Sequence, residues 1–238
     1  MRYIGKKHSL AWDYEGGIWS LDDRYEKSMW DRDGWPTIIR WEWALGYRSF
    51  DHTHSGHPST EAEMDNWFDT SNTNVTANNS GDYWPPNGFN WANANTAGAG
   101  GTALAANKPG FLPGNSYSFE AFGLIQAPET GTYTFALDGD DAMDLFVAGK
   151  NVANYYGAHG FEGIWANTGD NHYTNTIFLE ADRGYPFHVR MEEGGGGDGI
   201  QIGWALPSAP SSIVLIDNAY WYYPHYLDND EFAPRFKP

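Results

Sequence analysis

The sequence predicts an all-β protein built as an antiparallel β-sandwich, and three observations favour this fold class. From residue 116 onward, short apolar runs alternate with polar residues at a period of two. Glycine, proline and aspartate separate these runs, as they do between the strands of sandwich domains. No helical period recurs in this region, and nothing repeats at the ~20 to 50 residues typical of solenoids and propellers.

The composition indicates one folded domain with an extension. The chain has 238 residues, 41% of them hydrophobic, and no cysteine. At about 150 residues per domain this is enough for one large core. No apolar run approaches the ~20 residues of a membrane span, and no apolar stretch follows the basic N-terminal residues, so we expect neither membrane insertion nor a secretory signal. The lack of cysteine excludes disulfides, thiolate nucleophiles and zinc–thiolate sites.

The formal net charge of −17 belongs entirely to residues 51–238, because residues 1–50 carry equal numbers of basic and acidic side chains. Phosphate backbones and anionic lipids repel such a protein, so we expect no nucleic-acid partner and favour cations or neutral polar ligands. The shift in composition predicts an N-terminal attachment arm over 1–44, a sandwich over 45–217 and an aromatic C-terminal tail over 218–238.

The arm is predicted to be mostly irregular with one short helix. Ser20 and Asp23 resemble a capping box, and Leu21, Tyr25 and Met29 recur at helical spacing. Six tryptophans fall within the first 43 residues, more than so short a segment can bury alone. We therefore expect an interface with the second module or with another chain, formed by tryptophans that include Trp12, Trp19, Trp30 and Trp35.

Strands are predicted mainly in the second half of the chain. Residues 49–107 contain no lysine or arginine and are rich in Asn, Thr, Ser, Gly and Ala, which predicts loops with short strands. The strand-like runs that follow cover residues 117–119, 123–127, 133–137, 145–147, 176–179, 187–191, 200–204 and 213–216.

The densest polar cluster, residues 138–144, lies between two of these runs and contains four aspartates. Carboxylates this close repel one another, and a hard cation is the usual remedy. An EF-hand is excluded, because positions six and twelve from Asp138 are Met143 and Gly149. The alternative interpretation is a solvated acidic hairpin.

A second cluster begins with Glu192 and Glu193, continues with four glycines and reaches Asp198. Glycines allow backbone carbonyls to approach a ligand closely. Taken by itself, the segment is equally consistent with a flexible loop.

Several motifs follow one another in a recognisable order. They are GLIQAPETGTYTF at 123–135, Asp140-Asp141, LFVAGK at 145–150, LEADRGYPFHVRMEE at 179–193 and GWALP at 203–207. In their order and spacing over residues 115–215 the chain resembles the anthrax protective-antigen (PA-fourteen) domain, and residues 45–114 would be the divergent first portion of the domain. The resemblance implies a β-sandwich of about 150 or more residues.

In lectin-like members of that family, such as yeast flocculins and bacterial ice-adhesion proteins, two consecutive aspartates joined by a cis peptide bind calcium, and the calcium binds vicinal hydroxyls of a sugar. Asp140 and Asp141 occupy those positions. Further ligands come from an Asn or Asp and from carbonyls of neighbouring loops, and Asp198 is the local candidate. An aromatic ring supports the apolar face of the sugar. Candidates for that ring are Tyr155, Tyr156, Trp165 and Tyr173.

Residues 16–36 are similar to a segment that recurs in structural and tail-appendage proteins of tailed bacteriophages, in which a run like GIWSL leads to Trp35-Pro36. This resemblance implies a virion protein that is made in the host cytoplasm and released by lysis. The arm and the tail would contact other virion subunits, and we expect a homo-oligomer.

Other chemistries have weaker support. His52, His54 and His57 could supply imidazoles to zinc or nickel, although a histidine-rich loop without metal is the alternative. No carboxylate pair stands out from chance for glycoside hydrolysis, and neither a Gly-x-Ser-x-Gly elbow nor a phosphate loop is present.

The sequence therefore predicts a non-enzymatic virion protein, a capsid decoration or tail-appendage component with a calcium-dependent carbohydrate-binding domain. Two alternatives stay open. One is a purely structural virion building block without a ligand, and the other is a cellular calcium-dependent adhesin or lectin domain.

Overall fold

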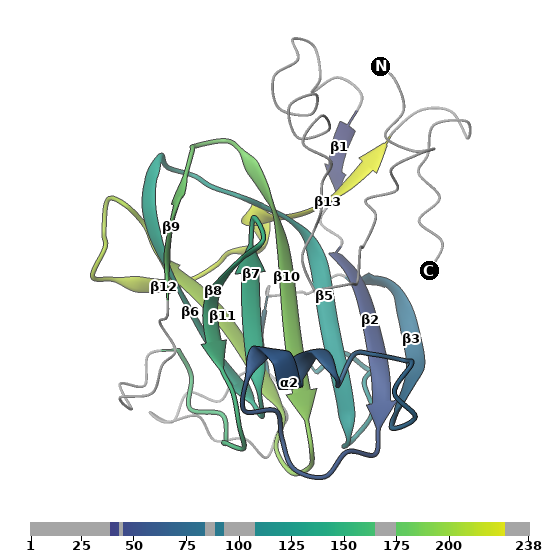
Figure 1. The fold of residues 1–238 in the computed structure, drawn as a ribbon. Helices are drawn as coiled ribbons and strands as arrows, with labels where there is room; N and C mark the ends of the chain where they lie inside the picture. Colours follow the sequence, from purple (N-terminus) through teal and green to yellow (C-terminus); the bar gives the residue numbers. More distant parts are fainter. Residues whose placement is uncertain (1–38, 43–44, 84–88, 93–107, 165–174, 227–238) are drawn as a thin grey trace.

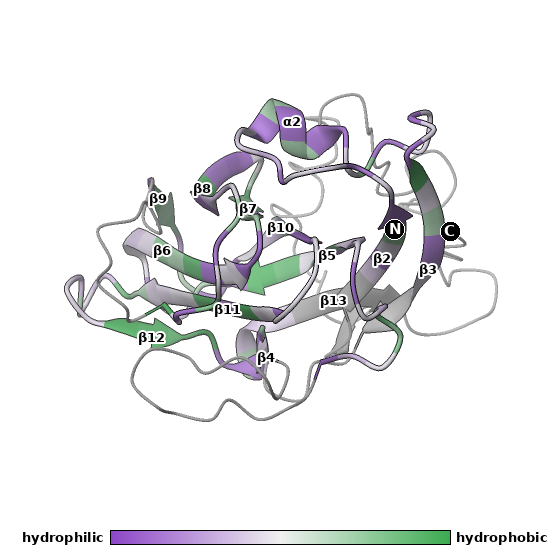
Figure 2. Ribbon diagram, turned by 90° about the horizontal axis from the view of Figure 1, so that it is seen from below, coloured by the Kyte–Doolittle hydropathy of each residue, from purple (hydrophilic) through white to green (hydrophobic). Residues whose placement is uncertain are grey.

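The computed structural model of the chain describes residues 39–42, 45–83, 89–92, 108–164 and 175–226. Within these residues, a pair of antiparallel sheets face each other, and a short helix lies on the outer face of the larger sheet (Figures 1 and 2). The prediction of an antiparallel β-sandwich is confirmed. The helix predicted in the arm lies outside the described residues.

The larger sheet has eight strands, and its centre is the long pair β5 and β10. β7 and β8 extend the sheet beyond β10. On the other side of β5, β2 pairs with its first half and β3 pairs with β2. β13 pairs with residues near the end of β5, and β1 pairs with β13. The strands are β1 (Ile39–Glu42), β2 (Leu45–His52), β3 (Val75–Tyr83), β5 (Tyr117–Gln126), β7 (Met143–Val147), β8 (Lys150–Tyr155), β10 (Gly184–Glu193) and β13 (Trp221–Tyr226).

The smaller sheet has five strands in the order β12-β11-β6-β9, and β4 pairs with the first residues of β11. A 3-10 turn, η2 (Asn218–Tyr220), leads from this sheet into β13. The strands are β4 (Asn90–Ala92), β6 (Gly131–Asp140), β9 (Thr176–Leu179), β11 (Gly199–Ala205) and β12 (Ile213–Leu215).

The main core lies between the sheets and follows from the period-two alternation. On β10, Phe187, Val189 and Met191 belong to this core. Trp204 and Tyr133 enter it from the smaller sheet, where their rings pack 5.3 Å apart between centroids. Because successive strand residues point to opposite faces, the intervening residues of β10 point away from the core.

The outer face of the larger sheet carries buried charged groups. Arg190 donates from Nε and Nη2 to the two carboxylate oxygens of Asp144, at 2.9 and 2.6 Å. It also forms an ion pair with Asp65 of α2 (Glu61–Asp65), so it links the helix to the sheet. A second apolar cluster, which includes Met64 and Phe68, packs beneath α2.

The α2 helix lies in a stretch predicted to be loop-dominated. Its N-cap is Thr60, whose side chain accepts a hydrogen bond from the backbone N–H of Glu63. The spacing Thr60-x-x-Glu63 is the signature of a capping box and was the available signal. β2 and β3, with eight and nine residues, are also longer than the short strands expected there.

Two of the described strands lie outside the predicted sandwich range of 45–217. β1 belongs to the arm and β13 to the tail, and they pair with each other. β13 in turn pairs with β5, so both strands are joined to the larger sheet. The boundaries at residues 44 and 217 stay predictions. Within the described residues, no helix has the length and apolar character needed to cross a membrane.

Candidate functional site

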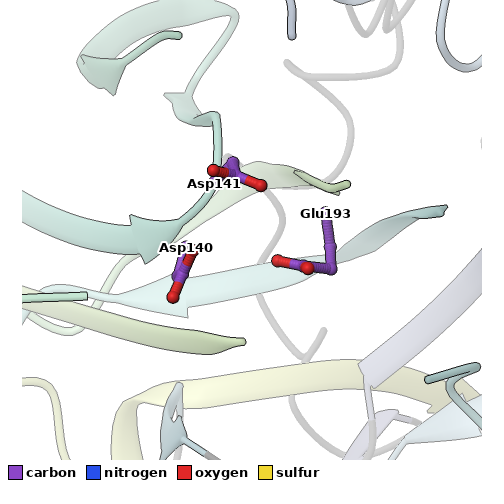
Figure 3. A group of neighbouring side chains, drawn as sticks. All are labelled: Asp140, Asp141 and Glu193. Carbon is purple, nitrogen blue, oxygen red and sulfur yellow. The ribbon is translucent and has the colours of Figure 1, made fainter. Parts of the chain in front are cut away.

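Three carboxylates converge at the end of the sandwich where β6 and β10 finish. Asp140 is the last residue of β6, Asp141 follows it, and Glu193 is the last residue of β10. One oxygen from each lies within 4.8 Å of the others. Figure 3 shows the three side chains around a common space. We call them the carboxylate triad. It is the only such group of three or more potential metal ligands among the residues that the structure describes.

The two aspartates are adjacent in the chain, and their peptide bond is cis. This matches what the resemblance to lectin-like members implies for Asp140 and Asp141. Both residues are buried. Burial, followed by the charge of Asp141, raises the pKa of Asp140 to about 7.

Glu193 is fully buried, and neither of its carboxylate oxygens has a hydrogen-bond partner among the described residues. Burial is the largest cause that raises its pKa to about 9, and the charges of Asp141 and Asp140 contribute further. A buried carboxylate without a donor is costly to ionise unless a positive charge is present. The site is therefore incomplete without a cation or a proton.

Asp141 is held in place by two other loops. The backbone N–H of His159 donates to its Oδ1 at 3.2 Å, and that of Gly194 donates to Oδ2 at 3.1 Å. The Nδ1 atom of His57 lies 3.3 Å from the same Oδ2. The carboxylate orientation is therefore determined by residues far apart in the sequence.

The other aspartates of the acidic cluster have different partners. Asp138 accepts a hydrogen bond from the backbone N–H of Glu162 at 2.7 Å and another from Gly163. Its pKa is raised to about 6, chiefly by burial. Asp144 lies on the outer face and binds Arg190. Of the four aspartates in residues 138–144, Asp140 and Asp141 belong to the carboxylate triad, and Asp138 and Asp144 do not.

Asp198, the predicted third ligand, lies beside the carboxylate triad. It precedes Gly199, which pairs with Asp140 across the sheet. Its side chain is fully buried, forms an ion pair with Lys108 and accepts a hydrogen bond from the Tyr117 hydroxyl at 3.1 Å. Because Lys108 neutralises it, Asp198 differs from Glu193, and its role as a ligand stays a prediction.

Tyr155 is the candidate for supporting a sugar that, among the described residues, lies nearest to the carboxylate triad through its contacts. Its ring contacts His159, whose backbone N–H donates to Asp141. Tyr155 pairs with Met143 across β7 and β8, and its ring stacks on His159 with centroids 3.3 Å apart. Tyr156 donates instead to Asp144 on the outer face, at 2.9 Å. Trp165 and Tyr173 lie outside the described residues, so Trp165 stays a prediction, as does a sugar contact by Tyr155.

The three histidines do not converge on a single point. His52 and His57 contact different oxygens of Glu192, at 3.4 and 3.0 Å. His54 is within 3.4 Å of the Asn72 amide and packs against the ring of Trp67. A zinc or nickel site formed by all three has no support from this arrangement.

The predicted interface residues Trp12, Trp19, Trp30 and Trp35 lie outside the described residues. Their role stays a prediction.

Glu193 is the member of the carboxylate triad that sequence reasoning did not assign as a ligand. In the sequence it is one of the two acidic residues that begin the glycine-rich cluster. The alternation of β10 carried the missing signal: with Met191 in the core, Glu193 points inward and Glu192 points outward.

The donor set of the carboxylate triad suits a hard divalent cation. Calcium takes six to eight oxygen ligands, and carboxylates are its usual protein donors. The unpaired oxygens of Glu193 fit this requirement, since a cation would supply the interaction they lack among the described residues. Three carboxylates would leave several coordination positions for backbone carbonyls, water or the hydroxyls of a ligand.

Solved structures with a similar fold include three adhesive or ice-associated domains. The PA14 domain of MpAFP antifreeze protein has a TM-score of 0.53 at 14% identity and covers 81% of this chain and 95% of that one. The PA14 sugar-binding domain from an RTX adhesin has a TM-score of 0.50 at 16% identity, over 76% and 98%. The A domain of Epithelial Adhesin 6 from Candida glabrata, in complex with Galb1-3GlcNAc, has a TM-score of 0.54 at 15% identity, over 85% and 96%.

No curated protein matches the chain. At these identities the structural likeness shows the fold. A sequence model of the PA14 domain matches residues 95–217, which contain the whole carboxylate triad and more than half of the chain. The chain therefore belongs to the PA14 domain family.

Proposed function

We propose that the protein is a non-enzymatic, calcium-dependent carbohydrate-binding protein that attaches to glycan-bearing surfaces. In this proposal Asp140, Asp141 and Glu193 hold the calcium ion. The bound ion offers open coordination positions to adjacent sugar hydroxyls, and Tyr155 supports the sugar from the side of His159.

The observation that carries the proposal is the buried carboxylate of Glu193, which faces Asp140 and Asp141 with no hydrogen-bond donor among the described residues. A solvated acidic hairpin would leave its carboxylates in water, where they need no counterion. Here all three members are buried. A cation offsets both their mutual repulsion and the desolvation of Glu193.

The carbohydrate aspect of the proposal is supported by the domains of similar fold. One is described as a sugar-binding domain, and another was solved with a disaccharide. The chemistry of the carboxylate triad is consistent with this use, because calcium exchanges water for hydroxyl oxygens without a change in the protein ligands.

Calorimetric titration with calcium tests the metal site. The wild-type chain should bind one calcium ion, and Asp141→Ala should abolish the binding heat. Asp69→Ala removes an exposed carboxylate far from the carboxylate triad in sequence and serves as the matched control, with affinity unchanged. Full calcium affinity in Asp141→Ala would overturn the site assignment.

A glycan array in calcium and in chelator tests the ligand class. Galb1-3GlcNAc is a suitable first probe, because an adhesin domain of the same fold was solved with it. Capture that requires calcium supports the proposal. Calcium binding without any glycan signal would favour the purely structural alternative for the domain.

We further propose that the chain acts on a bacteriophage virion as a decoration or tail-appendage component. The support is the resemblance of residues 16–36 to phage structural proteins. The arm and the tail would contact neighbouring subunits, and the protein would be a homo-oligomer. Mass spectrometry of purified particles tests this location, and secreted protein found free of particles would favour the cellular adhesin.

A further inference from the structure

His57 contacts one member of the carboxylate triad and the residue that precedes another. Its Nδ1 lies 3.0 Å from Oε2 of Glu192 and 3.3 Å from Oδ2 of Asp141. Glu192 is fully buried, while the His57 side chain is 22% exposed. Nδ1 is therefore within hydrogen-bond distance of both carboxylates, and the carboxylate of Glu192 is the nearer of the two. The contact with Glu192 therefore holds the imidazole ring beside Asp141.

The same ring packs tightly against the turn that follows β10. A Cβ atom placed on Gly194 would lie 2.5 Å from Cε1 of His57 and 3.2 Å from its Nε2. The residue at this position must therefore be glycine while the imidazole stays where it is. The backbone N–H of Gly194 is also a hydrogen-bond donor to Asp141. His57 thus packs against Gly194, whose N–H donates this hydrogen bond, and contacts the carboxylates of Asp141, which accepts it, and of Glu192.

The backbone around this contact is paired. Asp141 N donates to Glu192 O at 3.0 Å, and Glu192 N donates to Ala142 O at 2.8 Å. His52 lies 3.2 Å from the carbonyl oxygen of Glu193. Both histidines therefore lie against the segment that carries Glu193, and His57 also reaches a carboxylate of the triad.

We propose that His57, held by Glu192 and packed on Gly194, is a positioning residue that sets the orientation of Asp141 for the cation. Groups that orient metal ligands without touching the metal typically contribute a factor of about 10 to 100 to affinity. The inference rests on the calcium site proposed above and assigns to it a residue outside the carboxylate triad.

Substitutions at His57 separate positioning from simple packing. His57→Leu removes the donor and keeps an apolar side chain, and we expect it to weaken calcium affinity about 10- to 100-fold. His57→Asn retains an N–H donor near the position of Nδ1 and should recover most of the affinity. The matched control is His54→Leu, which removes an imidazole that contacts Asn72 and Trp67 instead. It should bind calcium like the wild type.

A glycine pair tests the same inference without any change at His57. Gly194→Ala should displace the imidazole and weaken calcium affinity by a similar factor. Gly195→Ala is the control, because its Cβ would make only ordinary contacts with Asn115 at 3.7 Å. Both measurements use the full chain, with affinities taken from calorimetric titration.

The outcomes distinguish the two proposals. If the wild-type chain binds calcium and His57→Leu binds it equally well, the positioning role is wrong and the site stands. If the wild-type chain binds no calcium, both proposals fail. If His57→Leu and His57→Asn lose affinity equally, the ring acts by packing alone and the inference is overturned.

Discussion

At the scale of single residues, the chemistry is concentrated in one unpaired carboxylate. Glu193 has no donor within the described residues, whereas Asp198, a few residues later, has Lys108 and Tyr117. Sequence alone presented both as acidic residues around a glycine run. Only the strand register and the position of a distant lysine distinguish them, and a lysine 90 positions away in the chain gives no local signal.

The raised pKa of Glu193 predicts a pH dependence of stability in the metal-free chain. Its pKa is about 9 in the folded state and near 4.5 in the unfolded state. Between these values the folded chain retains a proton that the unfolded chain has lost, so stability falls as pH rises from about 4.5 to 9. Glu193→Gln should make this decline shallower, chiefly between pH 7 and 9, because the raised pKa values of Asp140 and Asp138 account for part of the decline at lower pH. Urea unfolding in chelator at pH 5, 7 and 9 measures it, and parallel declines in both proteins would contradict the assignment.

At the scale of elements, the strands with strong apolar alternation were predictable and those without it were not. The runs at 187–191 and 200–204 became β10 and β11. β3 has the sequence VTANNSGDY, which lacks that alternation, and β13 contains Pro224, which weakens the signal for a strand. The pairing of β3 with β2 overrides its weak local preference, whereas Pro224 is compatible with β13 because the strand pairs there with β1 alone.

α2 provides a prediction at the same scale. Met64 is fully buried between the helix and the sheet, and it packs in the cluster that contains Phe50 and Phe68. Met64→Ala should lower the free energy of unfolding by about 2 to 5 kcal/mol, because it leaves a cavity. Chemical denaturation measures this loss. Ala62→Ser on the exposed side of α2 is the control and should change stability little. A loss below about 1 kcal/mol in Met64→Ala would mean that α2 is not docked as described.

At the scale of the whole molecule, the net charge of −17 and the carboxylate triad both predict stabilisation by salt, but by different amounts. Calcium at one hundred times its dissociation constant should add about 2.7 kcal/mol to the free energy of unfolding. Sodium chloride at matched ionic strength acts only by screening. Thermal melts in calcium, in chelator and in sodium chloride separate the two effects. Equal shifts in calcium and sodium would support the structural alternative.

The strand register also places two features of the molecule at opposite ends of β5. Tyr117 at the start of β5 pairs with Glu193, whereas Ile125 near its end pairs with Trp221 of β13. Eight residues of strand separate these contacts by about 26 Å, at about 3.3 Å per residue. Glu193 of the carboxylate triad and the β1–β13 pair therefore lie at opposite ends of the larger sheet. Figure 1 shows the end of β10 on the side of the sheet opposite to β13.

This arrangement determines how the fold responds to a mechanical load. Ile39 at the start of β1 lies opposite Tyr226 at the end of β13. A force that pulls these two residues apart therefore separates the two strands from that end, one residue pair at a time. Their hydrogen bonds then break one after another rather than together. We therefore expect a force applied through these two strands to break the β1–β13 pairing first. The carboxylate triad, at the other end of the larger sheet, should keep its geometry during this step.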